Sequence, residues 1–232
     1  MRLLDRPAGR RWHASIVHLG VTPGGGLANL RSVPRVVLLA GPSGSGKSHL
    51  ARSSGLPVVA LDDFYREGDD PMLPRHPALG IADWDDLDAW DAVRAVHTLV
   101  AICTTGAADI PVYDIAHDRV VRTERFTAGT SPVVVAEGLF AGEIAPECRE
   151  RGILADAIVV HRKPWKNFVR RLARDLAERR KPPLTLLRRG IALWRAERSV
   201  LKRQVALGCR PMSAAEVRHA LAAMAVGPPT PA

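Results

Sequence analysis

The sequence predicts an α/β fold in which a parallel β-sheet is flanked by helices. One observation behind this prediction is a series of short apolar runs rich in β-branched residues, which is typical of strands buried in a parallel sheet. The other is that stretches with apolar residues at helical spacing alternate with these runs. We expect strands at 36–40, 56–61, 133–136 and 157–160.

Three stretches predict helices. Residues 87–103 carry apolar side chains at helical spacing, and residues 168–179 do so with a strongly basic side. Residues 184–224 carry a further apolar stripe and are also expected to be helical. Strands and helices therefore alternate through most of the chain, as a parallel sheet with helical crossovers requires.

The 232 residues are enough for one large domain with a buried core. We expect an irregular N-terminal extension at 1–34, the domain at 35–224 and a flexible tail at 225–232. No apolar run approaches the roughly 20 residues that span a bilayer, and the first residues lack the apolar region of a secretory signal. We therefore expect a cytoplasmic protein with no membrane partner, whose three widely spaced cysteines are free thiols.

The net charge of +9 is unevenly distributed. Residues 161–203 contain fifteen Lys and Arg against three Asp and Glu. A basic block of this kind indicates a polyanionic partner, either a nucleic acid or the phosphates of a nucleotide.

The residues that follow the first expected strand match the pattern G-x-x-x-x-G-K-[ST] of a phosphate-binding loop, or P-loop. Glycines let the backbone curl so that successive N–H groups point at phosphate oxygens, and the next helix offers its first amides to them. Lys47 is expected to reach the β and γ phosphates of ATP, and the hydroxyl of Ser48 to ligate Mg²⁺. The residues expected to bind the nucleotide here are Gly41, Ser43, Gly44, Ser45, Gly46, Lys47, Ser48 and His49.

Acidic residues follow two other expected strands. Asp62 and Asp63 come after the second strand, at the edge of the sheet where ligands bind. One of these carboxylates could accept the proton of an attacking hydroxyl or hold the metal through water, and a cap of a turn is the alternative. Glu137 follows the third strand and is expected to coordinate Mg²⁺, with Gly138 allowing close approach of the backbone.

Three further segments have both a functional and a structural interpretation. The acidic cluster at 83–88 suits a helix start, or Trp84 and Asp85 could offer a stacking face and a ribose acceptor. Residues 111–119, expected as a loop, contain an aromatic residue and a lone histidine of the kind that is more often structural. The arginines of 170–181 either clamp a transferring phosphoryl group or form a solvated face.

Taken in order, these segments resemble the uridine kinase (uridine–cytidine kinase) family of P-loop kinases over about residues 36–181. The matching segments are the P-loop, D-D-F-Y-R at 62–66, W-D-D-L-D-A-W-D at 84–91, P-V-Y-D at 111–114 with His117 and Arg119, E-G at 137–138 and the arginine-rich helix of a lid at about 162–183. Beyond Lys181 the match ends, and the sequence offers no recognisable counterpart of the family's final strand.

The resemblance implies a role for each matched residue. Asp62 would be the general base on the nucleoside 5′-hydroxyl, acting with Lys47 and Arg174, and Asp85 would accept the ribose hydroxyls. Magnesium would be held by Ser48 and Glu137. The nucleoside pocket would be lined by Tyr65, Trp84, Tyr113 and His117. Arg171 would touch the substrate side, while Arg174 and Arg179 would brace the phosphates.

We therefore expect an ATP- and Mg²⁺-dependent kinase that converts uridine or cytidine to the 5′-monophosphate. The first alternative is a kinase of the same fold with another small alcohol as substrate, either a sugar phosphate or a pantothenate-like molecule. The second is a nucleotide-dependent nucleic-acid-binding protein, which is disfavoured because the basic stretch has few aromatic residues for base stacking. A homo-oligomer is left open.

Overall fold

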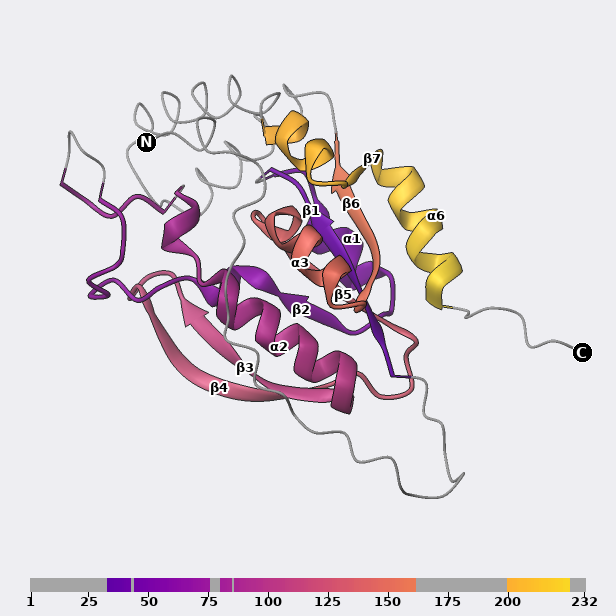
Figure 1. Ribbon diagram of the computed structural model, residues 1–232, viewed down its shortest axis with the longest axis horizontal. Coiled ribbons are helices and arrows are strands. Elements are labelled where there is room, and N and C mark those ends of the chain that lie inside the picture. Colours follow the sequence, from indigo (N-terminus) through magenta and orange to yellow (C-terminus); the bar gives the residue numbers. More distant parts are fainter. Residues whose placement is uncertain (1–32, 43, 76–79, 85, 162–199, 226–232) are drawn as a thin grey trace, which may run out of the picture.

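The computed structural model describes residues 33–42, 44–75, 80–84, 86–161 and 200–225. Its centre is a five-stranded sheet in the order β2-β5-β1-β6-β7, in which every neighbouring pair is parallel (Figure 1). The predicted α/β fold is confirmed, and the four expected strands lie where they were predicted. The five strands are β1 (Arg35–Ala40), β2 (Val58–Ala60), β5 (Val133–Gly138), β6 (Leu154–Val160) and β7 (Arg210–Met212).

Helices cover both faces of the sheet. The helices are α1 (Lys47–Ser53), α2 (Ala92–Thr105), α3 (Ala145–Glu150) and α6 (Ala214–Ala225), and residues 200–206 are also helical. Three 3₁₀ turns accompany them: η1 (Leu61–Phe64), η2 (Leu87–Ala89) and η3 (Ala141–Ile144). Among the described residues, none of the helices is long and apolar enough to cross a membrane.

After exposed Arg35, strand β1 is apolar throughout because it is buried on both faces and paired on both edges. Val36, Leu38 and Ala40 belong to one apolar core with residues of α2 and α3, whereas Val37 and Leu39 belong to a second core with residues of α1 and α6. All five side chains are completely buried. This two-sided burial explains why the strand reads as a continuous apolar run rather than as an alternating pattern.

The predicted helix at 87–103 begins later than expected. The side chain of Asp91 accepts a hydrogen bond from the Arg94 backbone N–H at 2.9 Å and caps α2, which therefore starts at Ala92. Just before it, the indole of buried Trp90 donates to the Leu61 carbonyl at 2.7 Å, and the backbone of Trp90 is extended. The helix ends at Gly106 in the left-handed conformation, a common C-terminal cap.

Two other expectations are wrong. Residues 111–119 are a loop only at 115–118, because β3 (Ala107–Asp114) and β4 (Arg119–Thr127) form an antiparallel hairpin outside the main sheet, beside α2, and these four residues are its turn (Figure 1). The expected helix over 184–224 is interrupted by β7, a fifth parallel strand that pairs with β6 where no final strand was recognised. The remainder of that stretch up to residue 199, the lid and most of the N-terminal extension lie outside the described residues.

Candidate functional site

Three segments predicted to carry the chemistry meet at one edge of the sheet. The P-loop follows β1, Asp62 follows β2, and Glu137 and Gly138 end β5. Because these three strands are adjacent and parallel, their carboxyl ends lie side by side. In the strand order, β2 and β5 lie to one side of β1, whereas β6 and β7 lie to the other. Ligands bind in open α/β sheets where the strand order changes direction in this way.

The P-loop has the curled backbone that its glycines predict. The N–H of Ser45 donates to the Pro42 carbonyl at 3.1 Å, which closes a tight turn. Gly44 and Gly46 have φ values of 84° and 86°, in the left-handed region that favours glycine. Gly46 then precedes the first turn of α1, where its carbonyl accepts from the Leu50 N–H at 3.0 Å. The shape of the loop thus depends on two glycines, whose backbone conformation few other amino acids could adopt.

Lys47, Ser48 and Glu137 converge beneath this loop. The Nζ atom of Lys47 lies 4.0 Å from Oε2 of Glu137, and the two side chains are 9% and 7% exposed. Burial raises the pKa of the Glu137 carboxyl, while Lys47 and a hydrogen bond from the Ser48 side chain act in the opposite direction. The structure therefore brings together the three residues predicted to hold the phosphates and Mg²⁺.

Two buried oxygen atoms at this place lack a hydrogen-bond partner among the described residues. They are Oγ of Ser45 and Oε2 of Glu137. A buried polar atom without a partner is costly, so native proteins rarely leave one unless a ligand or water satisfies it. A carboxylate and a serine hydroxyl beside a lysine suit Mg²⁺ and phosphate, so the residues present fit a magnesium–nucleotide complex.

Asp62 is held against the end of β5. Its Oδ1 atom accepts a hydrogen bond from the Leu139 N–H at 3.1 Å. A Cβ atom at Gly138 would lie 3.1 Å from the same oxygen and 2.8 Å from Cβ of Leu61, so the predicted close approach at this glycine is confirmed. Asp62 therefore lies beside Glu137, and its charge contributes to the raised pKa of the Glu137 carboxyl.

Asp63 points to a different part of the molecule. Its Oδ1 atom accepts a hydrogen bond from the backbone N–H of Tyr113 on β3 at 3.0 Å. Burial raises the pKa of its carboxyl, and the hydrogen bond from Tyr113 opposes that shift. The two neighbouring carboxylates, which the sequence left as alternatives for the base, thus have separate partners.

The predicted aromatic residues of the acceptor pocket form one cluster. The ring of Tyr65 lies 5.9 Å from that of Trp84 and 6.2 Å from that of Tyr113, and the Trp84 and Tyr113 rings are 6.4 Å apart. Buried Phe140 lies 6.2 Å from Tyr65 and completes this set, which we call the aromatic cluster. Phe140 was not among the predicted site residues, although it lies three residues after Glu137, just beyond the carboxyl end of β5. That position is a signal that could have identified it.

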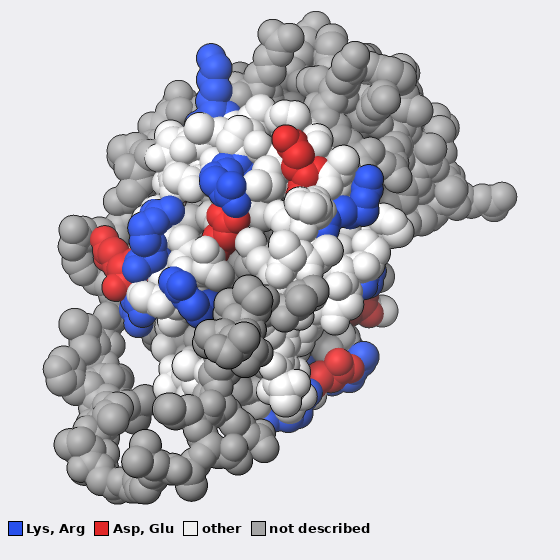
Figure 2. All heavy atoms as spheres, turned by 90° about the vertical axis from the view of Figure 1, so that its right-hand side faces the viewer, with Lys and Arg blue, Asp and Glu red and all other residues white. Residues whose placement is uncertain are grey.

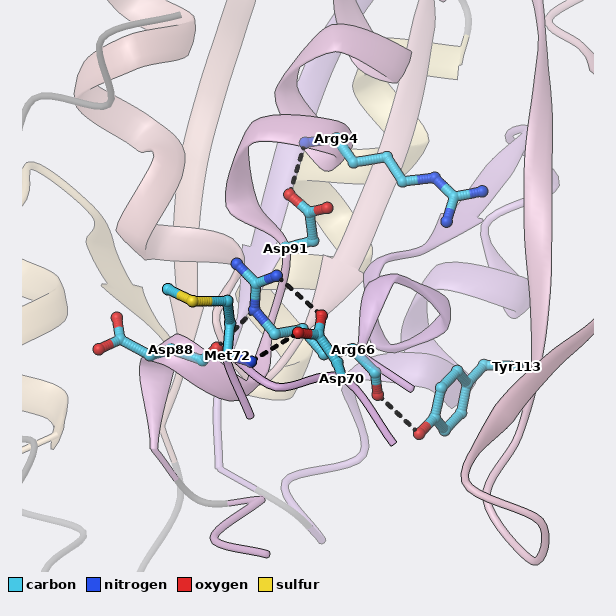
Figure 3. A network of polar contacts seen from close by, with 7 residues as sticks. All are labelled: Arg66, Asp70, Met72, Asp88, Asp91, Arg94 and Tyr113. Atoms are coloured by element: carbon cyan, nitrogen blue, oxygen red, sulfur yellow. Dashed lines mark hydrogen bonds and ion pairs between the residues drawn. The ribbon is translucent and has the colours of Figure 1, made fainter. Parts of the chain in front are cut away.

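Arg66, which no functional prediction included, joins the segments that carry the cluster (Figure 3). Its side chain donates to the Asp88 carbonyl at 2.8 Å and to the Asp70 carboxylate at 3.1 Å. Its own carbonyl accepts the hydroxyl of Tyr113 at 2.9 Å, and burial raises the pKa of that phenol. The Tyr113 hydroxyl is thus already engaged by the protein.

The remaining predicted residues are exposed or lie outside the described part of the chain. His117, on the turn of the hairpin, is 64% exposed, and its Nδ1 atom lies 2.7 Å from the Asp114 carboxylate. His49 is exposed on α1. Ser43, Asp85, Arg171, Arg174 and Arg179 lie outside the described residues.

Figure 2 shows the face of the molecule toward α6 and β7. On the described part of this face, acidic side chains lie between basic ones. Most of the basic stretch 161–203, on which the nucleic-acid alternative rests, lies outside the described residues.

Comparisons with known proteins identify the fold. No protein-family model and no curated protein matches the chain, whereas solved structures do. A provisionally named fructose transport system kinase from Silicibacter sp. TM1040 is 18% identical, with a TM-score of 0.50 over 80% of this chain and 90% of that chain. At this identity the likeness shows a shared fold.

Two other matches are less similar in structure. A provisionally named uridine kinase from Bacillus stearothermophilus is 20% identical, with a TM-score of 0.42 over 59% of this chain and 76% of that chain. Phosphoribulokinase from Rhodobacter spheroides is 18% identical, with a TM-score of 0.43 over 63% of this chain and 57% of that chain.

Proposed function

We propose that the protein is an ATP- and Mg²⁺-dependent kinase that transfers the γ-phosphoryl group of ATP to a hydroxyl of a small molecule. The observation that carries this proposal is the convergence of Lys47, Ser48 and Glu137 beneath a P-loop, with Asp62 beside them. The kinase name of the Silicibacter structure with the same fold agrees with it.

Each described residue of the site has a proposed role that its place supports. Ser48 and Glu137 would hold Mg²⁺, which neutralises phosphate charge when bound. Lys47 and the backbone N–H groups of the P-loop would stabilise the charge that develops on the transferred group. Asp62 would accept the proton of the attacking hydroxyl. The arginines Arg171, Arg174 and Arg179 remain proposed phosphate and substrate contacts through the family resemblance.

Positioning should account for most of the rate. The transition state of phosphoryl transfer is loose and needs little covalent assistance, so the enzyme gains most from aligning the hydroxyl with the phosphate. Asp62 is well suited to this task because the Leu139 N–H at 3.1 Å fixes one of its oxygens and leaves the carboxylate beside the end of β5.

For the acceptor, we propose a pyrimidine nucleoside phosphorylated at its 5′-hydroxyl. The aromatic cluster supports this choice because its half-buried members Tyr65, Trp84 and Tyr113 can pack against a planar base.

A second acceptor, a sugar phosphate or another small alcohol, is favoured by a specific observation. The hydroxyl of Tyr113 donates its proton to the Arg66 carbonyl, so in this state it cannot also donate to a base.

The experiment is a measurement of ADP release from ATP and Mg²⁺ with a panel of nucleosides, sugar phosphates and pantothenate-like alcohols. Release with uridine or cytidine, and not with purine nucleosides, would support both the kinase and its proposed acceptor. Release with a non-nucleoside alcohol would retain the kinase and replace the acceptor. Nucleotide binding without release on any member of the panel would contradict the proposal.

A further inference from the structure

The hairpin β3–β4 is fastened to the segment that follows Asp62. The backbone N–H and hydroxyl of Tyr113 donate to Asp63 and to the Arg66 carbonyl at 3.0 and 2.9 Å. The N–H of Gly68 donates to the Asp118 carbonyl at 2.7 Å. In addition, the Val120 N–H donates to the Glu67 carboxylate at 3.3 Å. Four hydrogen bonds thus join residues 63–68 to residues 113–120.

Asp63 is the part of this connection closest to the proposed base. It follows Asp62 in the 3₁₀ turn η1, and the two carboxylates reach opposite neighbours. Asp62 binds the N–H of Leu139 at the end of β5, whereas Asp63 binds that of Tyr113. One short turn therefore links the phosphate side of the site to the aromatic cluster.

The local structure of β3 shows that Tyr113 occupies a special place in the hairpin. The register between β3 and β4 shifts between Val112 and Tyr113, as it does at a β-bulge. Bulges commonly re-aim a side chain next to a binding site. Here the shift coincides with the residue whose N–H reaches Asp63 and whose ring joins the aromatic cluster.

We propose that Asp63 is a positioning residue for the acceptor, which holds the Tyr113 ring in the aromatic cluster at a set distance from Asp62 by accepting the Tyr113 N–H. The proposal rests on the proposed kinase function and assigns Asp63 no proton transfer. A half-buried carboxylate is costly unless it is hydrogen-bonded, and this acceptor bond offsets that cost.

The test compares Asp63→Ala with Asp63→Asn, which keeps an oxygen able to accept the Tyr113 N–H. We expect the KM for uridine or another accepted substrate to rise about tenfold or more in Asp63→Ala, because a hydrogen bond to a charged group is lost. The KM for ATP and kcat should change less than about threefold, since only binding of the acceptor is weakened. Asp63→Asn should recover most of the acceptor KM.

A matched control removes a carboxylate of the hairpin itself that does not contact residues 63–68. Asp109→Ala breaks an exposed ion pair in which Oδ1 of Asp109 lies 3.0 Å from the Arg125 guanidinium. This variant should leave the acceptor KM unchanged. A variant that was only partly folded would lower the concentration of active enzyme, and hence apparent kcat, without changing KM. The split between KM and kcat therefore separates positioning from loss of structure.

A second readout does not depend on turnover. Hydrogen exchange of the Tyr113 amide should become about tenfold faster in Asp63→Ala and stay near the wild-type rate in Asp63→Asn. An unchanged exchange rate or acceptor KM in Asp63→Ala would overturn the proposal, as would equal defects in the two variants. Absence of transfer by the wild-type protein would instead contradict the kinase function, while the exchange rate would still decide whether Asp63 holds Tyr113.

Discussion

The ammonium group of Lys47 and the carboxylate of Glu137 lie 4.0 Å apart in a nearly completely buried part of the site. At this distance the two charges attract without a direct hydrogen bond. Lys47 is therefore held close to where ATP phosphates would bind, and it partly offsets the cost of burying Glu137. This pair links the P-loop to the end of β5. We expect its loss to reduce activity before it reduces stability.

Lys47→Ala should abolish phosphoryl transfer while the protein remains folded. The change removes the cation that would neutralise the phosphates, and removal of such a group costs ~10² to 10³ in kcat. ADP release and an unfolding curve measured on the same sample test this prediction. Exposed Lys202→Ala is the control and should be fully active. Near-normal turnover by Lys47→Ala would show that the P-loop assignment is wrong.

Asp62→Asn should lower kcat by ~10² or more because the amide cannot take the proton of the attacking hydroxyl. The Asn oxygen can still accept from the Leu139 N–H, so the fold should be preserved. Steady-state kinetics under saturating ATP and acceptor measure the effect, and Asp109→Asn on the exposed face of β3 serves as a carboxylate-to-amide control. If kcat were unchanged, Asp62 would have to be a residue that only orients the substrate.

Much of this site could be predicted because it depends on local sequence. The P-loop needs glycines with positive φ and a lysine at set spacing, and Glu137 directly follows an apolar strand. The separate hydrogen-bond partners of Asp62 and Asp63 could not be predicted, because they depend on where β3 and β5 lie around the 3₁₀ turn.

The elements that were missed lack a clear hydrophobic period. Strand β4 is exposed along most of its length, so its sequence has no apolar face, and β7 has only three residues, one of which is a proline. The start of α2 was misplaced because the helical spacing of apolar residues continues back to Leu87. The Asp91 side chain caps the N-terminus of the helix, which therefore begins only at the next residue. The two strands were therefore missed for want of a pattern, and the helix start because a local cap overrides the apolar spacing.

The difference in unfolding free energy between Asp63→Asn and the wild type should depend on pH. The pKa of Asp63 is raised above its ordinary value of 3.8, so its ionised form destabilises the folded state relative to its protonated form. The contribution of Asp63 to stability is therefore lost as the pH rises from about 3.8 through the folded-state pKa. Denaturant titrations at a series of pH values should show the Asn variant gaining relative stability over this window and then levelling off. A difference that fell with pH would contradict the raised pKa.

Gly142→Ala should destabilise the protein by about 1–3 kcal/mol through overpacking. A Cβ atom there would lie 1.5 Å from Oε1 of Gln204, whose side chain is buried beside Glu143. The added methyl group should cost less in a Gln204→Ala background, with a coupling of roughly 0.5–3 kcal/mol in a double-mutant cycle. Equal costs in the two backgrounds, measured by denaturant unfolding, would mean that this contact does not limit packing.

The most direct test of the account follows the γ-phosphate itself. Wild-type protein is incubated with Mg²⁺, ATP labelled in the γ-phosphate, and in separate samples uridine, cytidine or one of the other alcohols of the panel. The products are separated and identified by mass. We predict that the label appears on the nucleoside 5′-oxygen, and that Lys47→Ala leaves it in ATP. A wild-type protein that binds ATP but passes the label to none of the acceptors, nucleoside or other alcohol, would contradict the central claim that this site is a small-molecule kinase.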